Sequence, residues 1–304
     1  MPDSPPDPVD ALYEQVRTVM PAPEGGAISA QFIAVAPGIR VLALRTPTLP
    51  PAAHTNAYLV GPDLGAQALV DPGSPYPDQQ SVLDAALDAE REAGRPLGMV
   101  LLTHHHGDHV GGAPATATRW AVPIAAHAAT ARRLAGRVDV TQPLAPGEMI
   151  ILGSVAVTCV FTPGHAEGHL CFEVGTASIV GDMVAGIGTI LIDPDEGDMG
   201  VYLDSLRTLL ARPVTRLLPA HGPAIADGPA KLREYLAHRA MREERVVGAL
   251  TAGPATIAEL TAAVYTDTPR PLWPLAERSL LAHLRKLVRE RRAREVDAGR
   301  WSSG

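Results

Sequence analysis

The stretch with the most chemical potential is residues 104–109, which holds four histidines and one aspartate in six positions. It follows an apolar run, residues 98–102, whose length and composition predict a buried strand. Functional residues of α/β proteins gather where such strands end. Imidazole and carboxylate groups are good ligands for Zn, Fe or Mn, so this cluster predicts a metal site.

The spacing within the cluster suggests how the ligands are shared. His104 and His106 alternate, so an extended chain lets both converge on one ion. Asp108 and His109 follow across a turn that Gly107 permits, and they can face a second ion beside the first. We expect His105 to point away from both ions.

The pattern H-x-H-x-D-H resembles the metal-binding motif of the metallo-β-lactamase superfamily of metal-dependent hydrolases. Further landmarks of that family follow in order: Thr162-Pro163-Gly164-His165, Gly181-Asp182 and Pro219-Ala220-His221-Gly222. The resemblance covers about residues 30–225. It implies an α/β fold, an αββα sandwich with the metal cleft between its two sheets.

The resemblance also implies a ligand set. His104, His106 and His165 would hold one metal, Asp108, His109 and His221 the second, and Asp182 would bridge them. Two zinc ions are expected, with Fe or Mn as alternatives. A metal-bound hydroxide would be the nucleophile, with Asp108 as the catalytic residue that orients it and carries its proton to the leaving group.

Two more residues are expected near the site. Asp71, in Asp71-Pro72-Gly73, resembles the family's early strand-end block, whose aspartate organises the site from behind; the alternative is a simple turn aspartate. His169 lies four positions after His165 and is a candidate for positioning a ligand or contacting substrate. Cys159 and Cys171 are expected to be buried thiols rather than metal ligands or a disulfide.

Periodicity and turn residues predict the elements that position these groups. The expected strands are residues 40–45, 56–60, 68–71, 98–102, 120–125, 150–152, 155–161, 170–174, 178–180 and 216–218. The expected helices are residues 9–20, 79–93, 128–134, 201–210, 230–249, 256–265 and 276–290, with one more opening after Gly112. The proposed domains are an N-terminal extension (1–28), a catalytic domain (29–228) and a winged-helix-like domain (229–304) that ends in a hairpin at 294–301.

The C-terminal domain leaves the substrate open. It is similar to that of the β-lactamase-like protein 2 branch, whose best-known member cleaves single-stranded RNA. Residues 229–304 carry 14 Lys and Arg against 9 Asp and Glu, although the whole chain has a net charge of −7. Such a domain could instead cover the cleft, shape an acyl pocket or form a homodimer interface.

Three functions follow from these observations. The leading hypothesis is a zinc hydrolase of an ester, thioester or lactone of a small molecule, because Asp182 replaces the cysteine common in true β-lactamases of the family. The second is a single-strand endoribonuclease, against which the aromatic content of 4% argues. The third is a nucleic-acid-binding protein with a structural metal site, which usually needs only four ligands. No apolar run is long enough for a membrane span, and no signal peptide is evident, so a cytoplasmic location is expected.

Overall fold

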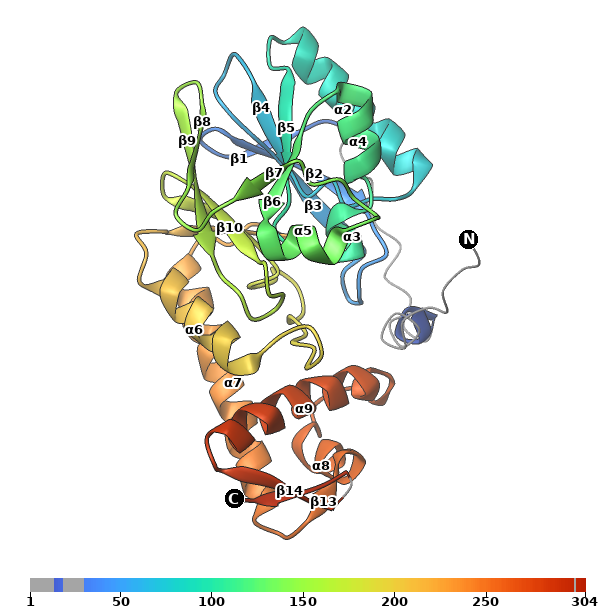
Figure 1. The fold of residues 1–304 in the computed structure, drawn as a ribbon, viewed down its shortest axis with the longest axis vertical. Coiled ribbons are helices and arrows are strands. Elements are labelled where there is room, and N and C mark those ends of the chain that lie inside the picture. The colour runs from blue at the N-terminus through green and yellow to red at the C-terminus, as the bar shows by residue number, and fades with distance from the viewer. Residues whose placement is uncertain (1–13, 19–29, 298) are drawn as a thin grey trace.

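Two β-sheets pack face to face, with helices on both outer faces and a mostly helical domain at the C-terminal end (Figure 1). The computed structural model describes residues 14–18, 30–297 and 299–304. Within the described residues, 14–18 are helical, and the rest of the helix expected at 9–20 lies outside them. The expected fold class, an αββα sandwich followed by a winged-helix-like domain, is confirmed.

The first sheet has seven strands in chain order. Its first four strands pair antiparallel as a meander, and β4 to β7 then pair parallel. The parallel pairs require crossover segments, which bring helices onto the outer face. The strands are β1 (Ile33–Ala36), β2 (Ile39–Arg45), β3 (His54–Val60), β4 (Gln67–Val70), β5 (Leu97–Leu101), β6 (Ile124–His127) and β7 (Gln142–Leu144).

The second sheet has five strands in the order β12-β11-β10-β9-β8. They are β8 (Met149–Leu152), β9 (Val155–Phe161), β10 (Leu170–Val174), β11 (Ala177–Gly181) and β12 (Arg216–Pro219). Apolar side chains of both sheets, including Tyr58, Leu101, Phe172 and Leu218, form one buried cluster between them. Alternation along each strand sends every second side chain into this core, which fixes the register of the ligand-bearing strand ends.

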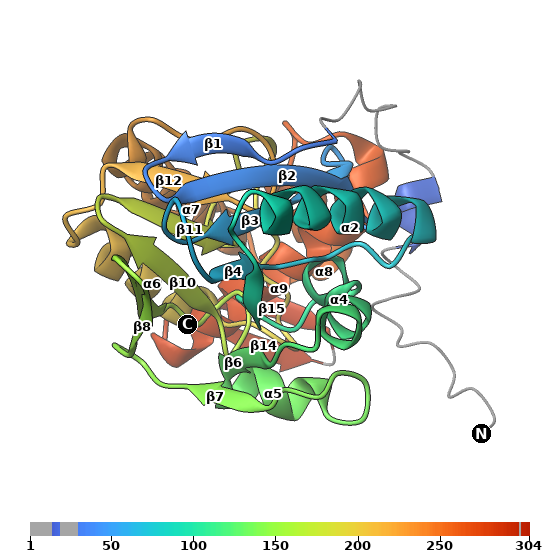
Figure 2. The ribbon, with the colours of Figure 1, turned by 90° about the horizontal axis from the view of Figure 1, so that it is seen from above.

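Helices cover the outer faces of the sandwich (Figure 2). On the first sheet, α2 (Pro77–Glu92) packs Leu83 and Leu87 against β2 and β3, and α4 (Ala113–Trp120) and α5 (Ala128–Leu134) cover the parallel strands. On the second sheet lie α6 (Met199–Leu210) and the start of α7 (Gly228–Leu250). The short α3 (Gly107–Val110) lies between β5 and α4 in the chain.

The C-terminal domain has its own core around Val246, Leu260, Leu280 and Trp301. It consists of the end of α7, β13 (Ala255–Thr256), α8 (Ile257–Val264), the 3-10 turn η1 (Arg270–Leu272), α9 (Trp273–Arg289), β14 (Ala293–Asp297) and β15 (Arg300–Ser303). The helix α8 begins with a capping box, in which Thr256 and Glu259 bond to each other's backbone N–H groups. The proposed boundary near residue 228 falls where α7 begins.

The start expected for the strand near 120–125 was wrong. Residues 113–120 form α4, and the strand begins at Ile124. Trp120 ends the helix, Ala121 adopts a left-handed conformation (φ 52°), and Pro123 has no N–H to donate. The apolar run therefore contains a helix end and a strand start, which periodicity alone did not separate.

Two edge strands were not expected. The side chains of β1 are half-exposed or exposed, and β7 contains Pro143, which is tolerated at a sheet edge. Cys159 and Cys171 are free and buried, as expected. Among the described residues, no helix is both long and apolar enough to cross a membrane.

Candidate metal centre

All seven expected ligands meet at one edge of the sandwich because each follows a strand end. His104 and His106 follow β5, and the next turn, α3, carries Asp108 and His109. The other three ligands, His165, Asp182 and His221, come directly after or within four residues of the ends of β9, β11 and β12. Short loops leave these side chains little freedom, so the sheets themselves position them.

The first group, here called the three-histidine cluster, consists of His104, His106 and His165. His106 Nδ1 lies 2.9 Å from His104 Nε2 and 3.0 Å from His165 Nε2, and the two Nε2 atoms are 3.3 Å apart. One nitrogen of each ring therefore faces a common point. This geometry suits a single ion.

The second group, here called the mixed cluster, consists of Asp108, His109 and His221. Asp108 Oδ2 lies 3.5 Å from His221 Nε2, and Asp108 Oδ1 lies 3.9 Å from His109 Nε2. The ligand atoms of this group also lie close enough together to share an ion. The two clusters are adjacent, with the His104 and His109 ring centroids 4.1 Å apart.

Asp182 stands between the two clusters. Its Oδ2 lies 3.5 Å from His165 Nε2, whereas its Oδ1 lies 3.3 Å from His221 Nε2 and 3.5 Å from His109 Nε2. One oxygen thus faces each cluster, as a bridging carboxylate requires. This arrangement agrees with the bridging role expected for Asp182.

In each of the five proposed ligand histidines, the ring nitrogen that points away from the clusters donates to an oxygen atom. His165 Nδ1 donates to Leu191 O at 2.9 Å, and His221 Nδ1 donates to His54 O at 3.0 Å. The acceptors for the other three rings, His104, His106 and His109, are Thr103 Oγ1 at 3.0 Å, Glu196 Oε2 at 2.8 Å and Asp71 Oδ2 at 2.8 Å. Because the outward nitrogen carries the proton, the inward nitrogen presents a lone pair.

Five lone pairs and two carboxylates that converge in one place fit metal ions. His109 Nε2 and Asp182 Oδ1 are buried there without a hydrogen-bond partner, a costly state for polar atoms unless a cation satisfies them. Nitrogen and oxygen donors in this number suit one or two Zn, Fe or Mn ions. The donor set therefore fits the metal centre that the sequence predicted.

The electrostatics of the two clusters differ. Burial lowers the pKa of His104 and lowers the pKa of His165 to about 4, so both rings are neutral and ready to bind a metal. At His109 and His221 burial acts in the same direction, but the carboxylates of Asp182 and Asp108 outweigh it and raise the pKa of both imidazoles. Metal binding at the mixed cluster therefore competes with protons.

Asp71 supports the mixed cluster from inside the sandwich. Its Oδ1 accepts from the Thr103 backbone N–H at 2.8 Å, and its Oδ2 accepts from Thr103 Oγ1 at 2.6 Å and from His109 Nδ1. Asp71 has a left-handed backbone (φ 50°), a conformation that aspartate tolerates better than most residues. These contacts agree with the organising role expected for Asp71 rather than with a simple turn residue.

His169 supports Asp182 through the backbone. The Asp182 N–H donates to His169 Nε2 at 3.2 Å, and His169 Nδ1 bonds to Thr162 Oγ1 at 2.9 Å. The ring has no exposed surface. Of the two roles expected for His169, these contacts favour positioning a ligand over contacting substrate.

Glu196 is the main residue that sequence reasoning missed. It bonds to His106 and lies 3.7 Å from His105 Nε2 through its other oxygen. His105 stays outside both clusters, as expected, but it is buried and faces Glu196. The available signal was the acidic run 193–198, which follows Asp182 in the chain.

The turn after His106 does not depend on a glycine at position 107, because Gly107 begins α3, is not among the glycines with positive φ, and a Cβ atom there would meet nothing within 4 Å. The glycine that matters is Gly73, where a Cβ atom would collide with Asp108 O at 1.8 Å. The Asp71-Pro72-Gly73 segment therefore lies directly against the backbone of α3. This close approach holds Asp108 and Asp71 in one rigid unit.

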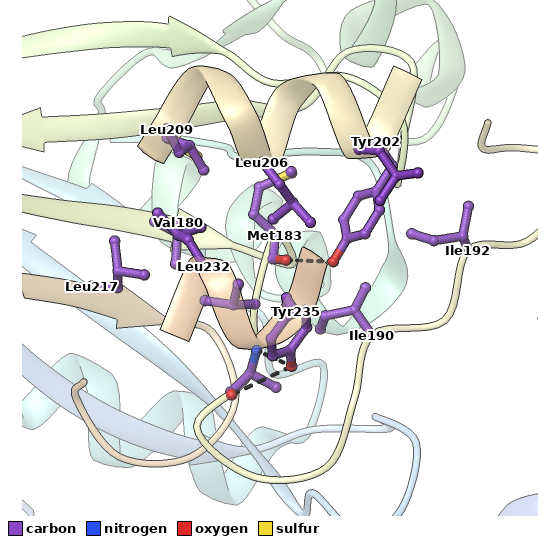
Figure 3. Close-up of a cluster of buried hydrophobic side chains, with 14 of the residues drawn as sticks. Val180, Met183, Ile190, Ile192, Tyr202, Leu206, Leu209, Leu217, Leu232 and Tyr235 are labelled. Atoms are coloured by element: carbon purple, nitrogen blue, oxygen red, sulfur yellow. Dashed lines mark hydrogen bonds between the residues drawn. The ribbon is translucent and has the colours of Figure 1, made fainter. Parts of the chain in front are cut away.

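The segment after Asp182 is anchored to the helices on the second sheet (Figure 3). Tyr202 Oη of α6 donates to Met183 O at 2.7 Å, and Tyr235 Oη of α7 accepts from the Ala185 N–H at 2.9 Å. Arg239 of α7 donates to Ile190 O. Because His165 bonds to the next carbonyl, that of Leu191, these contacts reach the three-histidine cluster.

The αββα sandwich and this donor set, with the matches to known proteins that follow, place the chain among metal-dependent hydrolases. The chain belongs to the metallo-beta-lactamase superfamily, whose sequence model matches residues 50–221. The model of the beta-lactamase associated winged helix domain matches residues 256–301. Both matches agree with the resemblance seen in the sequence.

Curated relatives include a lactamase-like protein, vrtG, of Penicillium aethiopicum. It is 33% identical over 249 residues, which cover 73% of this chain and 76% of that protein. The atrochrysone carboxyl ACP thioesterase of Emericella nidulans is 33% identical over 202 residues, or 64% of this chain and 59% of that protein. This chain therefore spans little more than half of the thioesterase.

Solved structures show the same fold over nearly the whole chain. A beta-lactamase domain protein from Burkholderia ambifaria has a TM-score of 0.78 at 21% identity and covers 93% of this chain and 98% of its own. A metallo-beta-lactamase family protein from Thermus thermophilus has a TM-score of 0.73 at 24% identity and covers 89% and 100%. At these identities the likeness concerns the fold alone.

Proposed function

We propose that this protein hydrolyses an ester, thioester or lactone bond with two zinc ions, and that a thioester is the substrate. The observation that carries the proposal is the set of seven converging ligands, in a chain 33% identical to a protein named as a carrier-protein thioesterase. The aspartate at position 182 supports it too, because both of its oxygens face ligand nitrogens.

In this proposal the three-histidine cluster would hold one ion and the mixed cluster would hold the other. Asp182 would be a ligand of both ions. When bound, such ions polarise a carbonyl oxygen and lower the pKa of water. The chain's own part is to fix these ligands before substrate arrives. The backbone and carboxylate acceptors on the outward nitrogens do so, because they lock each ring in one tautomer and one orientation.

Asp108 is the proposed proton carrier. Its side chain is 16% exposed, more than Asp182 or His221, so it lies toward the open side of the centre. In the overall reaction an oxygen–carbon bond forms from water while the carbon–sulfur bond breaks. Asp108 would take a proton from water and deliver it to the leaving thiolate.

The contacts of the C-terminal domain oppose the ribonuclease alternative. Its basic side chains are largely engaged within the molecule: Arg242 and Arg245 pair with Asp267, and Lys286 and Arg292 pair with Glu243. Arg278, Arg285 and Arg289 pair with the acidic segment 193–198. Binding a polyanion needs basic side chains free to replace counterions along it. Many of the basic side chains that the sequence showed in this domain therefore form ion pairs within the molecule.

The test is a turnover assay on metal-analysed protein. A panel of acyl thioesters, esters and lactones is compared with a fluorogenic single-stranded RNA, before and after chelation and again with added zinc, iron or manganese. We expect thioester turnover that chelation removes and zinc restores. Asp108→Asn should lose most of it, whereas Asp204→Asn, a change at an exposed residue of α6, should keep it.

Two outcomes would contradict the proposal. Cleavage of RNA without acyl turnover would favour the ribonuclease. Full activity in metal-free protein would remove the metal centre from the mechanism.

A further inference from the structure

A short acidic segment, Asp193 to Asp198, connects the metal centre to the C-terminal domain. On one side of it, Glu196 accepts from His106 Nε2 at 2.8 Å. On the other side, three arginines of α9 contact its neighbours. In Figure 1 the loop that precedes α6 in the chain lies next to α9. The residues in contact are 83 to 91 positions apart in the sequence.

Of the three arginines, Arg278 makes the most hydrogen bonds to the acidic segment. Its Nε donates to Asp193 Oδ2 at 2.8 Å and its Nη2 to Asp193 Oδ1 at 2.5 Å, which is a bidentate pair. The same Nη2 lies 2.6 Å from Asp195 Oδ2. The Asp193 side chain is only 5% exposed, so this pair is much less screened by solvent than a surface ion pair.

Two further arginines of α9 extend the contact. Arg285 donates to Pro194 O and lies 3.1 Å from Asp195 Oδ1. Arg289 donates to Asp198 Oδ1 at 2.7 Å, the same oxygen that caps the first turn of α6. Glu196 is thus flanked on both sides in the chain by residues that α9 holds.

The segment also lies against the backbone beside His165. The Asp198 N–H donates to Gly164 O at 2.7 Å. A Cβ atom at Gly197 would come within 2.5 Å of Gly164 O and 2.9 Å of His165 O. A shift of this segment would therefore disturb His165 directly and His106 through Glu196.

From these contacts we propose that Glu196 is a positioning residue for His106 and that α9 of the winged-helix domain holds Glu196 in place. Glu196 fixes the tautomer in which His106 Nδ1 presents its lone pair to the three-histidine cluster. The C-terminal domain is then part of the metal centre's support. This inference rests on the proposed metal centre, and its test measures metal binding rather than turnover.

The experiment compares metal affinity and metal environment in the full-length chain. Wild type, Glu196→Gln, Glu196→Ala and Arg278→Gln are titrated with zinc in competition with a chromophoric chelator. The visible spectrum of each cobalt-substituted protein reports the ligand geometry. Arg245→Gln is the matched control, because Arg245 pairs with Asp267 within the C-terminal domain rather than with the acidic segment.

Loss of a carboxylate behind a metal-binding histidine typically lowers metal affinity 10- to 100-fold. We expect Glu196→Ala to weaken one of two ions by about 100-fold and Glu196→Gln by about 10-fold. Arg278→Gln should weaken the same ion by a smaller factor, and the cobalt spectrum should change in all three. The control should match wild type.

Wild-type affinities and spectra in Glu196→Gln and Arg278→Gln would overturn the inference and leave the proposed function intact. If Arg278→Gln fails to fold, wild-type metal affinity and spectrum in Glu196→Gln alone would overturn the inference, because this substitution leaves the contacts of α9 in place. A wild-type protein that binds no metal would overturn the metal centre itself, and the inference with it.

Discussion

The three-histidine cluster and the mixed cluster are adjacent and share the pair of Asp71 and Thr103 behind His104 and His109, yet their remaining support comes from different parts of the chain. Behind the mixed cluster stand Asp71, which accepts from His109, and the backbone of β3, which accepts from His221. Behind the three-histidine cluster stand Leu191 and Glu196, both from the segment between β11 and α6. One cluster depends on the β-sandwich, and the other depends also on helices packed outside it.

The two clusters therefore differ in whether elements outside the sandwich support them. Strand ends and the Gly73 contact set the mixed cluster within the catalytic fold. The segment between β11 and α6 that supports the other cluster is held by side chains of α7, at Ile190, and of α9, at Asp193. A change in the C-terminal domain is therefore expected to reach one cluster before the other. Substitutions in and behind each cluster test this asymmetry.

The largest effect is expected where the two clusters meet. Asp182→Asn removes the charge that faces both, so we expect weaker binding of both ions and at least about 1000-fold slower turnover, equivalent to several kcal/mol of lost charge stabilisation. Metal analysis and kcat/KM measure it, with Asp204→Asn as the control. A loss confined to one ion would assign Asp182 to a single cluster and break the symmetry of the bridge.

The next effect distinguishes the clusters. Asp71→Asn keeps the shape and the tolerance for a left-handed backbone but removes the carboxylate that His109 bonds. We expect affinity for the ion at the mixed cluster to fall about 10- to 100-fold, and affinity for the other ion to fall less, because Asp71 reaches His104 only through Thr103. Chelator competition measures both. Equal weakening of the two ions would show that their supports are not separate.

The third prediction concerns the contact between α7 and α9. The imidazole of His283, with Lys286 and Arg292, contacts Glu243 of α7 and lowers the pKa of its carboxyl from 4.5 to about 2. A lowered pKa means that the carboxylate stabilises the fold above the unfolded-state pKa and stops doing so as the pH falls through the folded-state value. We expect Glu243→Gln to lower the free energy of unfolding by about 2 to 3 kcal/mol near pH 7.

Urea unfolding of wild type and Glu243→Gln at several pH values tests this. The difference between the two proteins should shrink as the pH falls from about 4.5 toward about 2, because wild-type Glu243 becomes protonated over that range. Glu244→Gln, a change at the neighbouring position on α7, serves as the control. A difference that stays constant over the range would show that charge is not the cause.

The smallest effect is expected at Arg285. Arg285 contacts the same acidic segment as Arg278, but its ion pair with Asp195 is about half-exposed on both sides. Exposed pairs contribute about 0 to 1 kcal/mol, so Arg285→Gln should change stability by less than about 1 kcal/mol and leave metal affinity unchanged. Thermal unfolding and zinc titration measure it. An effect as large as that of Arg278→Gln would mean that the burial of an ion pair does not determine how much it contributes here.

The ligands could be predicted from the sequence because each depends on a local pattern. His104 and Asp108 are four residues apart at a strand end, and His165 lies in the polar turn between the apolar runs that form β9 and β10. Glu196 and its arginines could not be found in this way. Their contacts join positions far apart in the chain, and neither the acidic run nor the basic excess states which charges will meet.

The same distinction applies to the fold. The strands β9 and β10 and the helix α5 have the bounds that the sequence predicted, and the two strands could be bounded because each is an apolar run flanked by turn residues. The strand expected at 120–125 was wrong where a helix ended inside an apolar run. The edge strands β1 and β7 have too few buried side chains to show a period.

The helix α7 has a consequence for how the molecule comes apart. Its 23 residues span about 35 Å as one continuous rod. Leu232 and Tyr235 near its start belong to the core on the second sheet, and Val246 and Leu250 near its end belong to the core of the C-terminal domain. Losing either core exposes apolar surface on the element that the other core needs. We therefore expect the two domains to unfold as a single cooperative unit and a chain cut within this helix to lose that cooperativity.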